Sequence, residues 1–427
     1  MKRILLLSTT TGYQLRSFGE SADRLGIELT FATDRCQHLD DPWRDGAIPV
    51  RFFDPDGSLE AIRLANADRP FSGVLAVGDR PAVLAARAAK LLGLPGNPPA
   101  AAEATRNKKL MRQKFGEAGL AVPWFLELPA GDSLESILTR VRYPCVVKPL
   151  GLSGSRGVMR ADNAGQLAHA VQRVRTLLGR PEIRAQRTGL EEQLLIEGFI
   201  DGEEYAVEAV MTRGELRVLA IFDKPDLLDG PFFEETIYVT PTDAPKEVQR
   251  AIAAELQGAA SALGLVHGPI HAECRVGRRG VVMLEIAARP IGGLCSKVLR
   301  FAQGDDTVPF EDVLLRHCRG DDLSSYERAR SASGVMMIPI PKRGIFKKMR
   351  GEEAARGVPN VEDLQITAKT DQLLEPLPEA DGYLGFIFAR ARTTVEVTAA
   401  LREAHRRLVF EIDPEIRVVG VGAASGD

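Results

Sequence analysis

The sequence predicts an α/β protein with mixed α+β parts, in which a parallel sheet comes first and a small α+β domain comes last. In the first hundred residues, short apolar runs alternate with helical patterns, and such strand–helix–strand units form a parallel sheet with helices on both faces. From about residue 321 the character of the chain changes again. A length of 427 residues favours two to four domains, because one compact core rarely grows so large.

The N-terminal domain is predicted over residues 1–104. Its apolar runs are short enough for buried strands, and its helical patterns end at Gly26 and Gly93. A Pro-rich stretch at residues 94–99 marks the end of this domain. The predicted elements are strands at 4–7, 27–31 and 73–77 and helices at 15–25 and 81–92.

The central domain is predicted over residues 105–320, with a mobile lid at about 146–200, and the C-terminal α+β domain over 321–427. A polar, Arg-rich segment at 179–189 is expected to be a mobile loop. The basic cluster at 342–350 is interpreted as a solvated hairpin. The predicted helices are 105–118, 164–178, 246–263 and 394–408, and the predicted strands are 143–149, 193–196, 205–210, 216–222, 271–276, 281–286, 335–340 and 382–389.

Composition argues against several classes of partner. The formal net charge of −3 provides no global basic field for nucleic acid. No apolar run reaches the roughly 18 residues that span a bilayer, and the N-terminal apolar run is too short for a signal peptide. We therefore expect a soluble, cytoplasmic protein without membrane partners. A reducing compartment also fits the cysteines, which are scattered, form no C-x-x-C pair and are expected to be small buried residues: Cys36, Cys145, Cys274, Cys295 and Cys318.

Two common phosphate-binding signatures are absent from the sequence. No G-x-x-x-x-G-K-[ST] motif occurs, and the first strand leads into Ser8-Thr9-Thr10-Thr11-Gly12 instead of G-x-G-x-x-G. The strand at 143–149 carries Lys148 near its end, and a short loop rich in glycine and serine follows it. Glycines let backbone N–H groups approach phosphate oxygens, and serines add hydroxyl donors. The alternative is a surface turn beside a salt-bridging lysine.

A second candidate segment, residues 197–208, follows an apolar strand and is rich in acidic residues. Its backbone can face the edge of an adenine, with Phe199 and Ile200 as apolar walls. Glu204 can accept hydrogen bonds from ribose hydroxyl groups. The alternative is an acidic hairpin on the surface.

The third candidate segment is a predicted hairpin that joins the strands at 271–276 and 281–286. Glu273 and Glu285 can then point from one face of the sheet into one site. Buried carboxylates are costly unless they are paired or bound to metal, and two converging carboxylates together with phosphate oxygens suit Mg²⁺.

Arg289 follows this hairpin closely. Its guanidinium can bind a carboxylate or a phosphate through two parallel hydrogen bonds. Gly292 and Gly293 come next and can form a turn that receives an anion. The alternative is a structural ion pair between Glu285 and Arg289.

These three segments occur in the order and spacing of the ATP-grasp superfamily, and the resemblance covers nearly the whole chain. Residues 1–100 resemble the pre-grasp domain, 105–320 the ATP-grasp fold, and the tail the C-terminal domain of many members. Within the superfamily the chain most resembles the dipeptide-forming L-amino-acid ligases. That resemblance rests on Gly268-Pro269-Ile270-His271-Ala272-Glu273 and on Glu285-Ile286-Ala287-Ala288-Arg289-Pro290-Ile291-Gly292-Gly293.

The resemblance implies a role for each candidate residue. It implies that Lys108 is the first lysine that binds the ATP phosphates, with Lys109 as the competing choice. Lys148 is the second such lysine and is also assigned a catalytic role. The loop over the phosphates comprises Ser153, Gly154, Ser155 and Gly157. Adenine and ribose are assigned to Glu197, Gly198, Phe199, Ile200 and Glu204. Glu273 and Glu285 are assigned to the metal, Arg289 to catalysis, and the substrate residues are Arg289, Gly292, Gly293 and His271.

Some of these residues have simpler interpretations. A structural role is the simpler interpretation for His267 and His271. The segment at 223–235 together with Tyr238 either lines the substrate pocket or is a plain loop. The family pattern has asparagine as a further metal ligand where this chain has Ala287. An alanine cannot bind metal, so either water fills that position or one Mg²⁺ is held more weakly.

The implied function is an ATP-dependent carboxylate–amine ligase. It forms an acyl phosphate and joins a carboxylate, expected to be an amino acid, to an amine, using Mg²⁺ or alternatively Mn²⁺. The family suggests a homodimer. The alternatives are another ATP-grasp enzyme, either biotin-carboxylase-like or a purine-pathway ligase, and a non-catalytic ATP-binding module.

Overall fold

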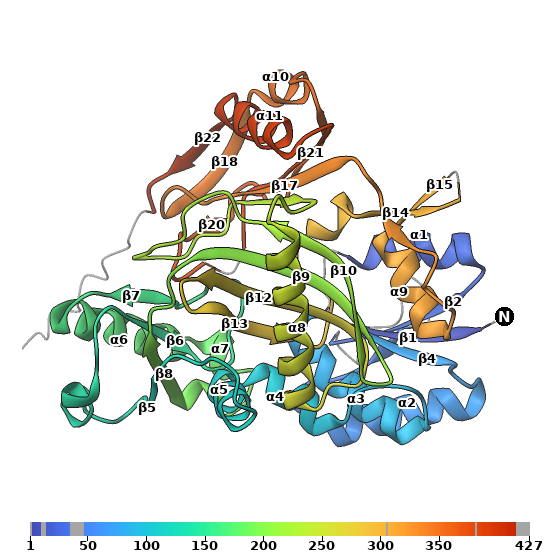
Figure 1. Ribbon diagram of the computed structural model, residues 1–427, viewed down its shortest axis with the longest axis horizontal. Helices are drawn as coiled ribbons and strands as arrows, with labels where there is room; N and C mark the ends of the chain where they lie inside the picture. Colours follow the sequence, from blue (N-terminus) through green and yellow to red (C-terminus); the bar gives the residue numbers. More distant parts are fainter. Residues whose placement is uncertain (1, 10–13, 35–46, 305, 381, 416–427) are drawn as a thin grey trace, which may run out of the picture.

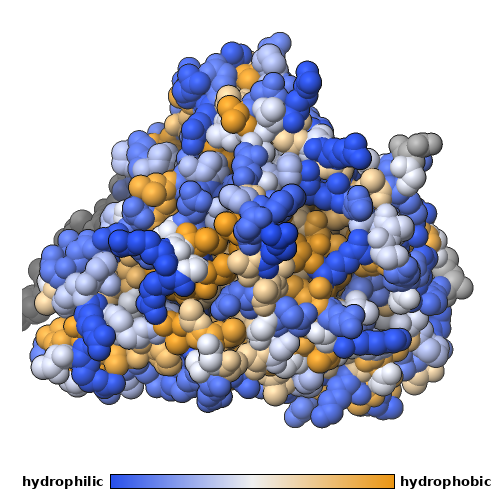
Figure 2. All heavy atoms as spheres, in the orientation of Figure 1, coloured by the Kyte–Doolittle hydropathy of each residue, from blue (hydrophilic) through white to orange (hydrophobic). Residues whose placement is uncertain are grey.

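The computed structural model describes residues 2–9, 14–34, 47–304, 306–380 and 382–415, and within these ranges the strands form five sheets (Figure 1). Residues 10–12 of the first predicted loop and Cys36 lie outside the described residues. No helix in the described part of the chain is both long and apolar enough to cross a bilayer. Figure 2 shows that the face carrying helix α8 has a mainly hydrophilic rim, with apolar side chains showing near its centre.

The N-terminal part is a parallel sheet of order β3-β2-β1-β4, as predicted. The side chains of β1 alternate between the two faces of the sheet and contribute to two hydrophobic cores. Ile4 and Leu6 pack on one side, and Leu5 and Leu7 pack on the other. Its elements are β1 (Arg3–Ser8), α1 (Leu15–Leu25), β2 (Glu28–Thr33), β3 (Ile48–Pro49), α2 (Pro55–Asp68), β4 (Gly73–Val77) and α3 (Asp79–Leu92). Of these, β3 and α2 were not predicted, and α3 begins at Asp79, before the predicted start.

The chain enters its central part through two helices, α4 (Pro99–Arg106) and α5 (Lys108–Glu117). One helix was predicted over 105–118, and that prediction was wrong at its start. Asn107 has extended backbone and ends α4, and its side chain caps α5 by accepting a hydrogen bond from the Leu110 N–H at 3.1 Å. The break places Lys108 in the first turn of a new helix.

A four-stranded sheet of order β5-β8-β6-β7 forms the region predicted as the lid. Helix α6 packs on it through an apolar face that includes Leu167, Val171 and Val174. The predicted Arg-rich loop at 179–189 contains a short helix, so that prediction was wrong in part. The elements are β5 (Phe125–Pro129), β6 (Cys145–Pro149), β7 (Met159–Ala161), α6 (Ala164–Leu178), α7 (Pro181–Arg184) and β8 (Gln193–Gly198), with 3-10 turns at Leu134–Ser136, Leu138–Arg140 and Leu190–Glu192.

The largest sheet has eight strands in the order β13-β12-β9-β10-β11-β17-β21-β19 (Figure 1). Helix α8 covers one face of it through residues such as Ile252 and Leu256. The sheet continues past residue 321, so the division of domains at that residue stays a prediction. The elements are β9 (Glu203–Thr212), β10 (Glu215–Asp223), β11 (Ile237–Thr240), α8 (Lys246–Leu263), β12 (His267–Gly277), β13 (Gly280–Ala287), β17 (Ala332–Ile338), β19 (Val361–Ile366) and β21 (Gly385–Ala391).

Two three-stranded sheets complete the described fold. The basic cluster lies mainly on β18, where neighbouring carboxylates pair with its cations; Lys347 Nζ, for example, lies 2.7 Å from Asp371 Oδ1. The elements are β14 (Arg300–Gln303), β15 (Asp306–Pro309), α9 (Phe310–Arg319), β16 (Glu327–Arg328), β18 (Gly344–Arg350), α10 (Glu352–Arg356), β20 (Leu373–Leu374), α11 (Thr394–Arg406) and β22 (Val409–Asp413), with a 3-10 turn at Cys295–Val298.

Candidate active site

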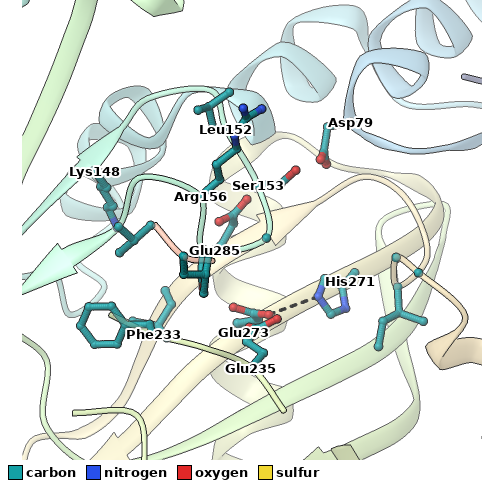
Figure 3. A pocket seen from close by; sticks show the side chains of 18 of the residues that line it. Asp79, Lys148, Leu152, Ser153, Arg156, Phe233, Glu235, His271, Glu273 and Glu285 are labelled. Carbon is teal, nitrogen blue, oxygen red and sulfur yellow. Dashed lines mark ion pairs between the residues drawn. The ribbon is translucent and has the colours of Figure 1, made fainter. Parts of the chain in front are cut away.

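A cavity of about 500 Å³ lies where the main parts of the fold meet (Figure 3). Its wall includes Asp79 at the start of α3, Lys148 on β6, Glu273 on β12 and Tyr383 just before β21. All of the predicted site residues line this cavity except Gly157. The fold therefore brings together three segments that are far apart in the sequence.

Lys108 presents its ammonium group to the cavity from the first turn of α5. Its Nζ donates to the Leu152 carbonyl at 2.6 Å and lies 3.3 Å from Glu285 Oε2. Lys109, the competing choice, pairs with Glu127 instead, and neither of these two residues lines the cavity. The geometry therefore favours Lys108 over Lys109 as the cation at this site.

Glu197 holds Lys148 in place. Its buried carboxylate accepts hydrogen bonds from Arg112 Nε at 2.8 Å and Nη2 at 3.1 Å, and it forms an ion pair with Lys148. Arg112 also donates to the carbonyls of Met283 at 3.3 Å and Leu284 at 3.0 Å. Burial raises the pKa of Glu197, but the two cations outweigh burial and lower it to about 2. Glu197 is therefore suited to orient Lys148, and less suited to the contact with adenine that was predicted for it.

The segment after Glu197 provides apolar walls, as predicted, but fewer free backbone donors. The N–H of Gly198 donates to the Trp124 carbonyl at 2.9 Å, and the N–H of Phe199 donates to the Pro144 carbonyl at 3.1 Å. The Phe199 ring stacks beside Phe233, with centroids 6.3 Å apart. A base bound here must therefore use other backbone groups of the segment.

The loop between β6 and β7 has the left-handed backbone that its glycines allow. Gly154, Ser155 and Gly157 have φ angles of 64°, 55° and 76°. The N–H of Gly157 donates to the Pro378 carbonyl at 2.7 Å, so this glycine anchors the loop to the C-terminal part instead of facing the cavity. The other predicted loop residues face the cavity.

Glu273 and Glu285 lie directly opposite each other in the antiparallel pairing of β12 and β13. Directly opposed residues point to the same face of a sheet, and both side chains line the cavity, as predicted (Figure 3). Two carboxylates on one face are hard oxygen ligands that fit Mg²⁺. Ala287 pairs with His271 in the same register and offers no ligand.

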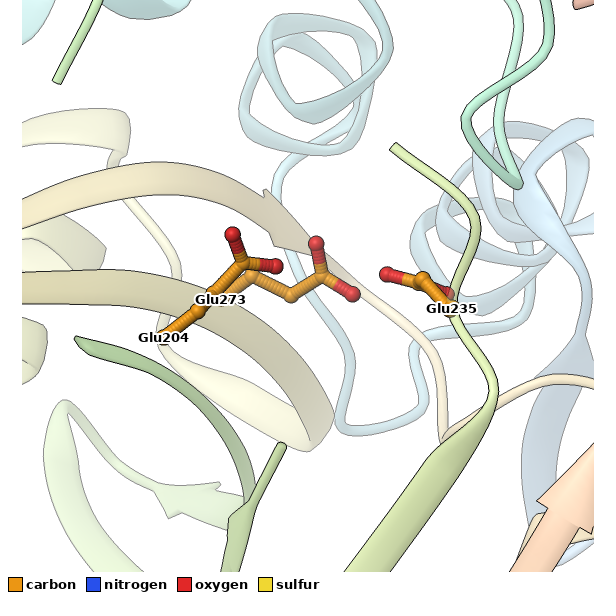
Figure 4. A group of neighbouring side chains, drawn as sticks. All are labelled: Glu204, Glu235 and Glu273. Carbon is orange, nitrogen blue, oxygen red and sulfur yellow. The ribbon is translucent and has the colours of Figure 1, made fainter. Parts of the chain in front are cut away.

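Two further carboxylates, those of Glu204 and Glu235, lie close to Glu273. Ligand oxygens of Glu204, Glu235 and Glu273 lie within 4.8 Å of one another (Figure 4). The Lys224 Nζ lies 2.7 Å from Glu204 Oε1, 2.7 Å from Glu235 Oε1 and 3.2 Å from Glu273 Oε1. Burial and the charge of Glu273 raise the pKa of Glu235 to about 7. Because Glu204 also accepts from Arg275 Nε at 2.8 Å, a ribose hydroxyl would have to compete with two cations for it.

Arg289 is held by a carboxylate from the N-terminal part of the fold. Its Nε and Nη2 donate to Asp79 Oδ1 at 2.8 Å and Oδ2 at 3.3 Å, and its Nη1 donates to the Pro290 carbonyl at 3.0 Å. Burial opposes the charge on Asp79, but Arg289 outweighs burial and lowers the pKa of Asp79 to about 2. The partner of Arg289 is thus Asp79 and not Glu285.

His271 lies in the cavity wall, between two carboxylates. Its Nδ1 is 2.6 Å from Glu208 Oε1, and its Nε2 is 3.5 Å from Glu273 Oε1 (Figure 3). Burial lowers the pKa of His271, but Glu208 outweighs burial and raises it to about 9. The other Glu208 oxygen accepts from the Ile291 N–H at 3.0 Å, which fixes the start of the predicted glycine turn. His267, by contrast, does not line the cavity.

The predicted substrate segment contributes part of the wall, and the C-terminal part of the chain contributes the rest. Phe233, Glu234 and Tyr238 line the cavity from the segment before and within β11, opposite apolar side chains such as Met337 and Phe386. No individual role was predicted for four charged residues that position the site, namely Asp79, Arg112, Glu208 and Lys224. Two of them, Glu208 and Lys224, lie within the candidate segments at 197–208 and 223–235. Glu208 had a usable signal, since it is an acid within the apolar run of β9.

Three family models match successive parts of the chain. They describe an ATP-grasp N-terminal domain at residues 19–96, an ATP-grasp domain at residues 141–298 and an L-amino acid ligase C-terminal domain at residues 336–413. The chain belongs to the ATP-grasp superfamily. Enzymes of this family use ATP, typically with Mg²⁺.

The proteins that this ATP-grasp protein resembles include an L-amino acid ligase and an alanine–anticapsin ligase. The crystal structure of an L-amino acid ligase from Bacillus licheniformis is similar with a TM-score of 0.81 and 28% identity, over 97% of this chain and 99% of that one. An alanine–anticapsin ligase from Bacillus subtilis (strain 168) is 28% identical over 220 residues, which are 48% of this chain and 46% of that ligase. An uncharacterised protein from Sinorhizobium fredii is 24% identical over 97% of this chain and 84% of its own length. The fold is therefore that of the ATP-grasp enzymes, and the likeness within them is to the L-amino acid ligases.

Proposed function

We propose that the protein is an ATP-dependent carboxylate–amine ligase that joins two amino acids through an acyl phosphate. The observation that carries the proposal is the meeting of two kinds of charge in one cavity. Lys108 and Lys148 supply cations for phosphate, and Glu273 and Glu285 supply opposed carboxylates for a metal. The similarity to L-amino acid ligases supports amino acids as the substrates.

The first step of the proposed reaction transfers a phosphoryl group. A carboxylate oxygen of the donor attacks the γ-phosphorus of ATP, and ADP leaves. Phosphoryl transfer depends mainly on positioning and on neutralisation of charge. Lys108 and Lys148 neutralise phosphate charge, and Glu197 with Arg112 keeps Lys148 aimed at the cavity. Glu273 and Glu285 would hold Mg²⁺, which would neutralise further charge on the phosphates.

The second step forms the amide bond. The nitrogen of the amine substrate attacks the acyl carbon, phosphate leaves, and the nitrogen loses a proton. Arg289, oriented by Asp79, stabilises the negative oxygen that develops on the acyl carbon. An acyl phosphate hydrolyses readily, so the Ser153–Gly157 loop must exclude water while the amine binds. The hydrogen bond from the Gly157 N–H to the Pro378 carbonyl connects this loop to the C-terminal wall of the cavity.

A pairwise screen of amino acids tests the proposal. We expect one ADP and one phosphate for each dipeptide formed, with the product identified by its mass. Glu285→Ala and Lys148→Ala should each lower kcat by about a hundredfold or more, because each removes charge that the transition state requires. The control Lys90→Ala removes a lysine at the exposed end of α3 and should keep full activity.

Other outcomes of the screen would contradict the proposal. Full activity in both site variants would contradict the assignment of the site. Tight binding of ATP without ADP release for any amino acid pair would indicate a non-catalytic module. Turnover only with bicarbonate and biotin, or only with a ribosylamine, would indicate another ATP-grasp reaction.

A further inference from the structure

One cation at the edge of the active-site cavity has no ion-pair partner among the residues that the structure describes. Arg106 is the last residue of α4 and lines the cavity. Its Nε is buried without a hydrogen-bond acceptor, and no ion pair joins it to any other residue in the described part of the chain. Other cations of the cavity wall are engaged, for example Arg289 with Asp79. Burial lowers the pKa of Arg106, and the charges of Asp79 and Glu103 oppose this effect without outweighing it.

Arg106 also marks the place where two cavities adjoin. A smaller cavity of about 350 Å³ shares Arg80, Arg106 and Gln186 with the active-site cavity. Arg87 and Arg187 line the smaller cavity as well, and Glu103 is the one acidic residue among its lining residues in the described ranges. Arg87 pairs with Glu103, and Arg80 Nη2 lies 3.6 Å from Asp34 Oδ2. The excess positive charge of the junction therefore comes mainly from Arg106 and Arg187. Such an excess attracts an anionic group.

The position of Arg106 relates it to the reacting centre. Arg106 and Asp79 both line the active-site cavity, and the charge of Asp79 opposes the effect of burial, which lowers the pKa of Arg106. Asp79 in turn binds Arg289 through both carboxylate oxygens. Arg106 thus shares the cavity wall with the carboxylate that orients Arg289.

Amide bond formation creates a specific need for such a cation. The donor carboxylate is consumed when it becomes an acyl phosphate, but an amino acid that serves as the amine keeps its own carboxylate. Arg289 already has another role, because Asp79 and the Pro290 carbonyl take up three of its five N–H groups and the remaining two are assigned to the negative oxygen on the acyl carbon. Lys108 and Lys148 face the region assigned to the phosphates.

We propose that Arg106 binds the free carboxylate of the amino acid that serves as the amine. This inference rests on the proposed ligase function and adds to it the residue that recognises the second substrate. A guanidinium can hold a carboxylate through two parallel hydrogen bonds, which fixes the position of the attached amine. Arg106 acts here as a binding and specificity residue.

The test compares an amino acid with the amide of the same amino acid as the amine substrate. The wild-type protein should use the best amino acid from the pairwise screen at least tenfold better, in kcat/KM, than the matching amide, because only the acid can pair with Arg106. Arg106→Met keeps much of the apolar stem but removes the charge. It should raise KM for the acid about tenfold or more and bring the ratio of acid to amide close to one.

Two further variants separate a specific effect from a general one. Arg106→Lys keeps a positive charge and should keep part of the preference for the acid. It provides a second measurement of that preference if Arg106→Met does not fold. Arg63→Met removes an exposed arginine that pairs with Glu60 on α2, and it should keep the full preference. Equal use of acid and amide by the wild-type protein, or an unchanged ratio in both Arg106 variants, would overturn the assignment.

Hydroxylamine distinguishes failure of this inference from failure of the proposed function. It attacks acyl phosphates without needing a carboxylate site, so hydroxamate and ADP formation by the wild-type protein tests the first step alone. Absence of hydroxamate with every amino acid donor would remove the proposed function and this inference with it. Formation of hydroxamate together with an unchanged acid preference in the Arg106 variants would remove only the role of Arg106.

Discussion

Lys148 shows how burial adjusts the chemistry of a single side chain. Its ammonium group is buried against the Glu197 carboxylate, which Arg112 also holds. Burial lowers the pKa of Lys148 to about 8, even though Glu197 favours the charged form. The charge that we assign to the ATP phosphates therefore begins to disappear just above neutral pH.

Affinity for ATP should depend on pH through this lysine. The protonated form binds phosphate, so affinity should be full well below pH 8 and should fall, by up to about tenfold per pH unit, as pH rises through 8. Equilibrium binding of ATP between pH 6.5 and 9.5 measures this effect. Lys148→Arg serves as the comparison, since arginine stays charged throughout that range and should flatten the profile. The same slope in both proteins would show that another group titrates.

The buried pair of Arg112 and Glu197 should be important for stability. Arg112→Met leaves the Glu197 carboxylate buried with only Lys148 as a partner, and removal of one member of a buried pair costs about 3–5 kcal/mol. The variant should melt several degrees below the wild-type protein in a thermal scan. Arg112→Met combined with Glu197→Leu and Lys148→Met should recover part of that loss, because no buried charge of this group remains unpaired. A triple variant that is less stable than Arg112→Met alone would contradict this explanation.

The site residues that were predicted have recognisable motifs around them in the sequence, whereas the residues that were missed depend on partners far along the chain. Lys148, Glu273 and Arg289 belong to local motifs, in which strand pattern and nearby glycines indicate the site. Asp79 and Arg112 act through partners far along the chain, Arg289 and Glu197. Residue spacing cannot reveal such a pairing, because it arises only when separate elements pack together. Lys224 is similar, since its three carboxylate partners come from β9, β12 and the segment before β11.

At the scale of elements, the loop between β6 and β7 is held by contacts at both ends. Lys108 Nζ binds the Leu152 carbonyl near its start, and the Gly157 N–H binds the Pro378 carbonyl near its end. Arg173 of α6 also pairs with Glu379 through two hydrogen bonds of 2.9 Å and 2.8 Å. The predicted lid is therefore joined to the C-terminal part of the fold on one side of the loop.

Two glycines of this loop should respond differently to replacement by alanine. At Gly157 an added Cβ would lie 2.8 Å from Pro149 Cγ and 3.0 Å from Leu177 Cδ2, in addition to the cost of a positive φ angle. At Gly154 φ is also positive, but no atom lies within 4 Å of an added Cβ. Gly157→Ala should therefore displace the loop and raise KM for ATP more than Gly154→Ala, which should cost only about 1–2 kcal/mol in backbone conformation.

Steady-state kinetics with varied ATP and a thermal scan of both variants measure this difference. Equal effects of the two substitutions would show that only the backbone angle matters. A larger effect of Gly154→Ala would show that direct contact between the loop and ATP outweighs the packing of Gly157.

Most elements could be predicted because their patterns are strong, and the exceptions have physical reasons. Helices α6 and α8 match the predicted ranges, since their apolar residues recur at helical spacing. The two-residue strand β3 is too short to show any period. Helix α2 has few buried residues, chiefly Ser58 and Ile62, so it lacks a broad apolar face. The break at Asn107 depends on a capping hydrogen bond within a stretch that otherwise favours helix.

At the scale of the whole molecule, the cavity connects parts of the fold that have separate cores. The N-terminal part contributes Asp79, the four-stranded sheet contributes Lys148, the large sheet contributes Glu273, and the C-terminal part contributes Tyr383. Distinct hydrophobic clusters stabilise these parts. A ligand that contacts several of them at once should stabilise their arrangement in addition to binding.

Binding of ATP should therefore raise the melting temperature, and the metal should supply a separate part of the increase. At a ligand concentration of about 100 times Kd, binding to the folded state alone adds about 2.7 kcal/mol. We expect a rise of a few degrees with ATP and Mg²⁺, a similar rise with Mn²⁺, and a smaller rise with ATP and EDTA. Glu273→Gln with Glu285→Gln should abolish the metal-dependent part but keep the rest, because the lysines remain. A metal-dependent rise that persists in this double variant would place the ion elsewhere, with the carboxylates of Glu204 and Glu235 as the next candidates.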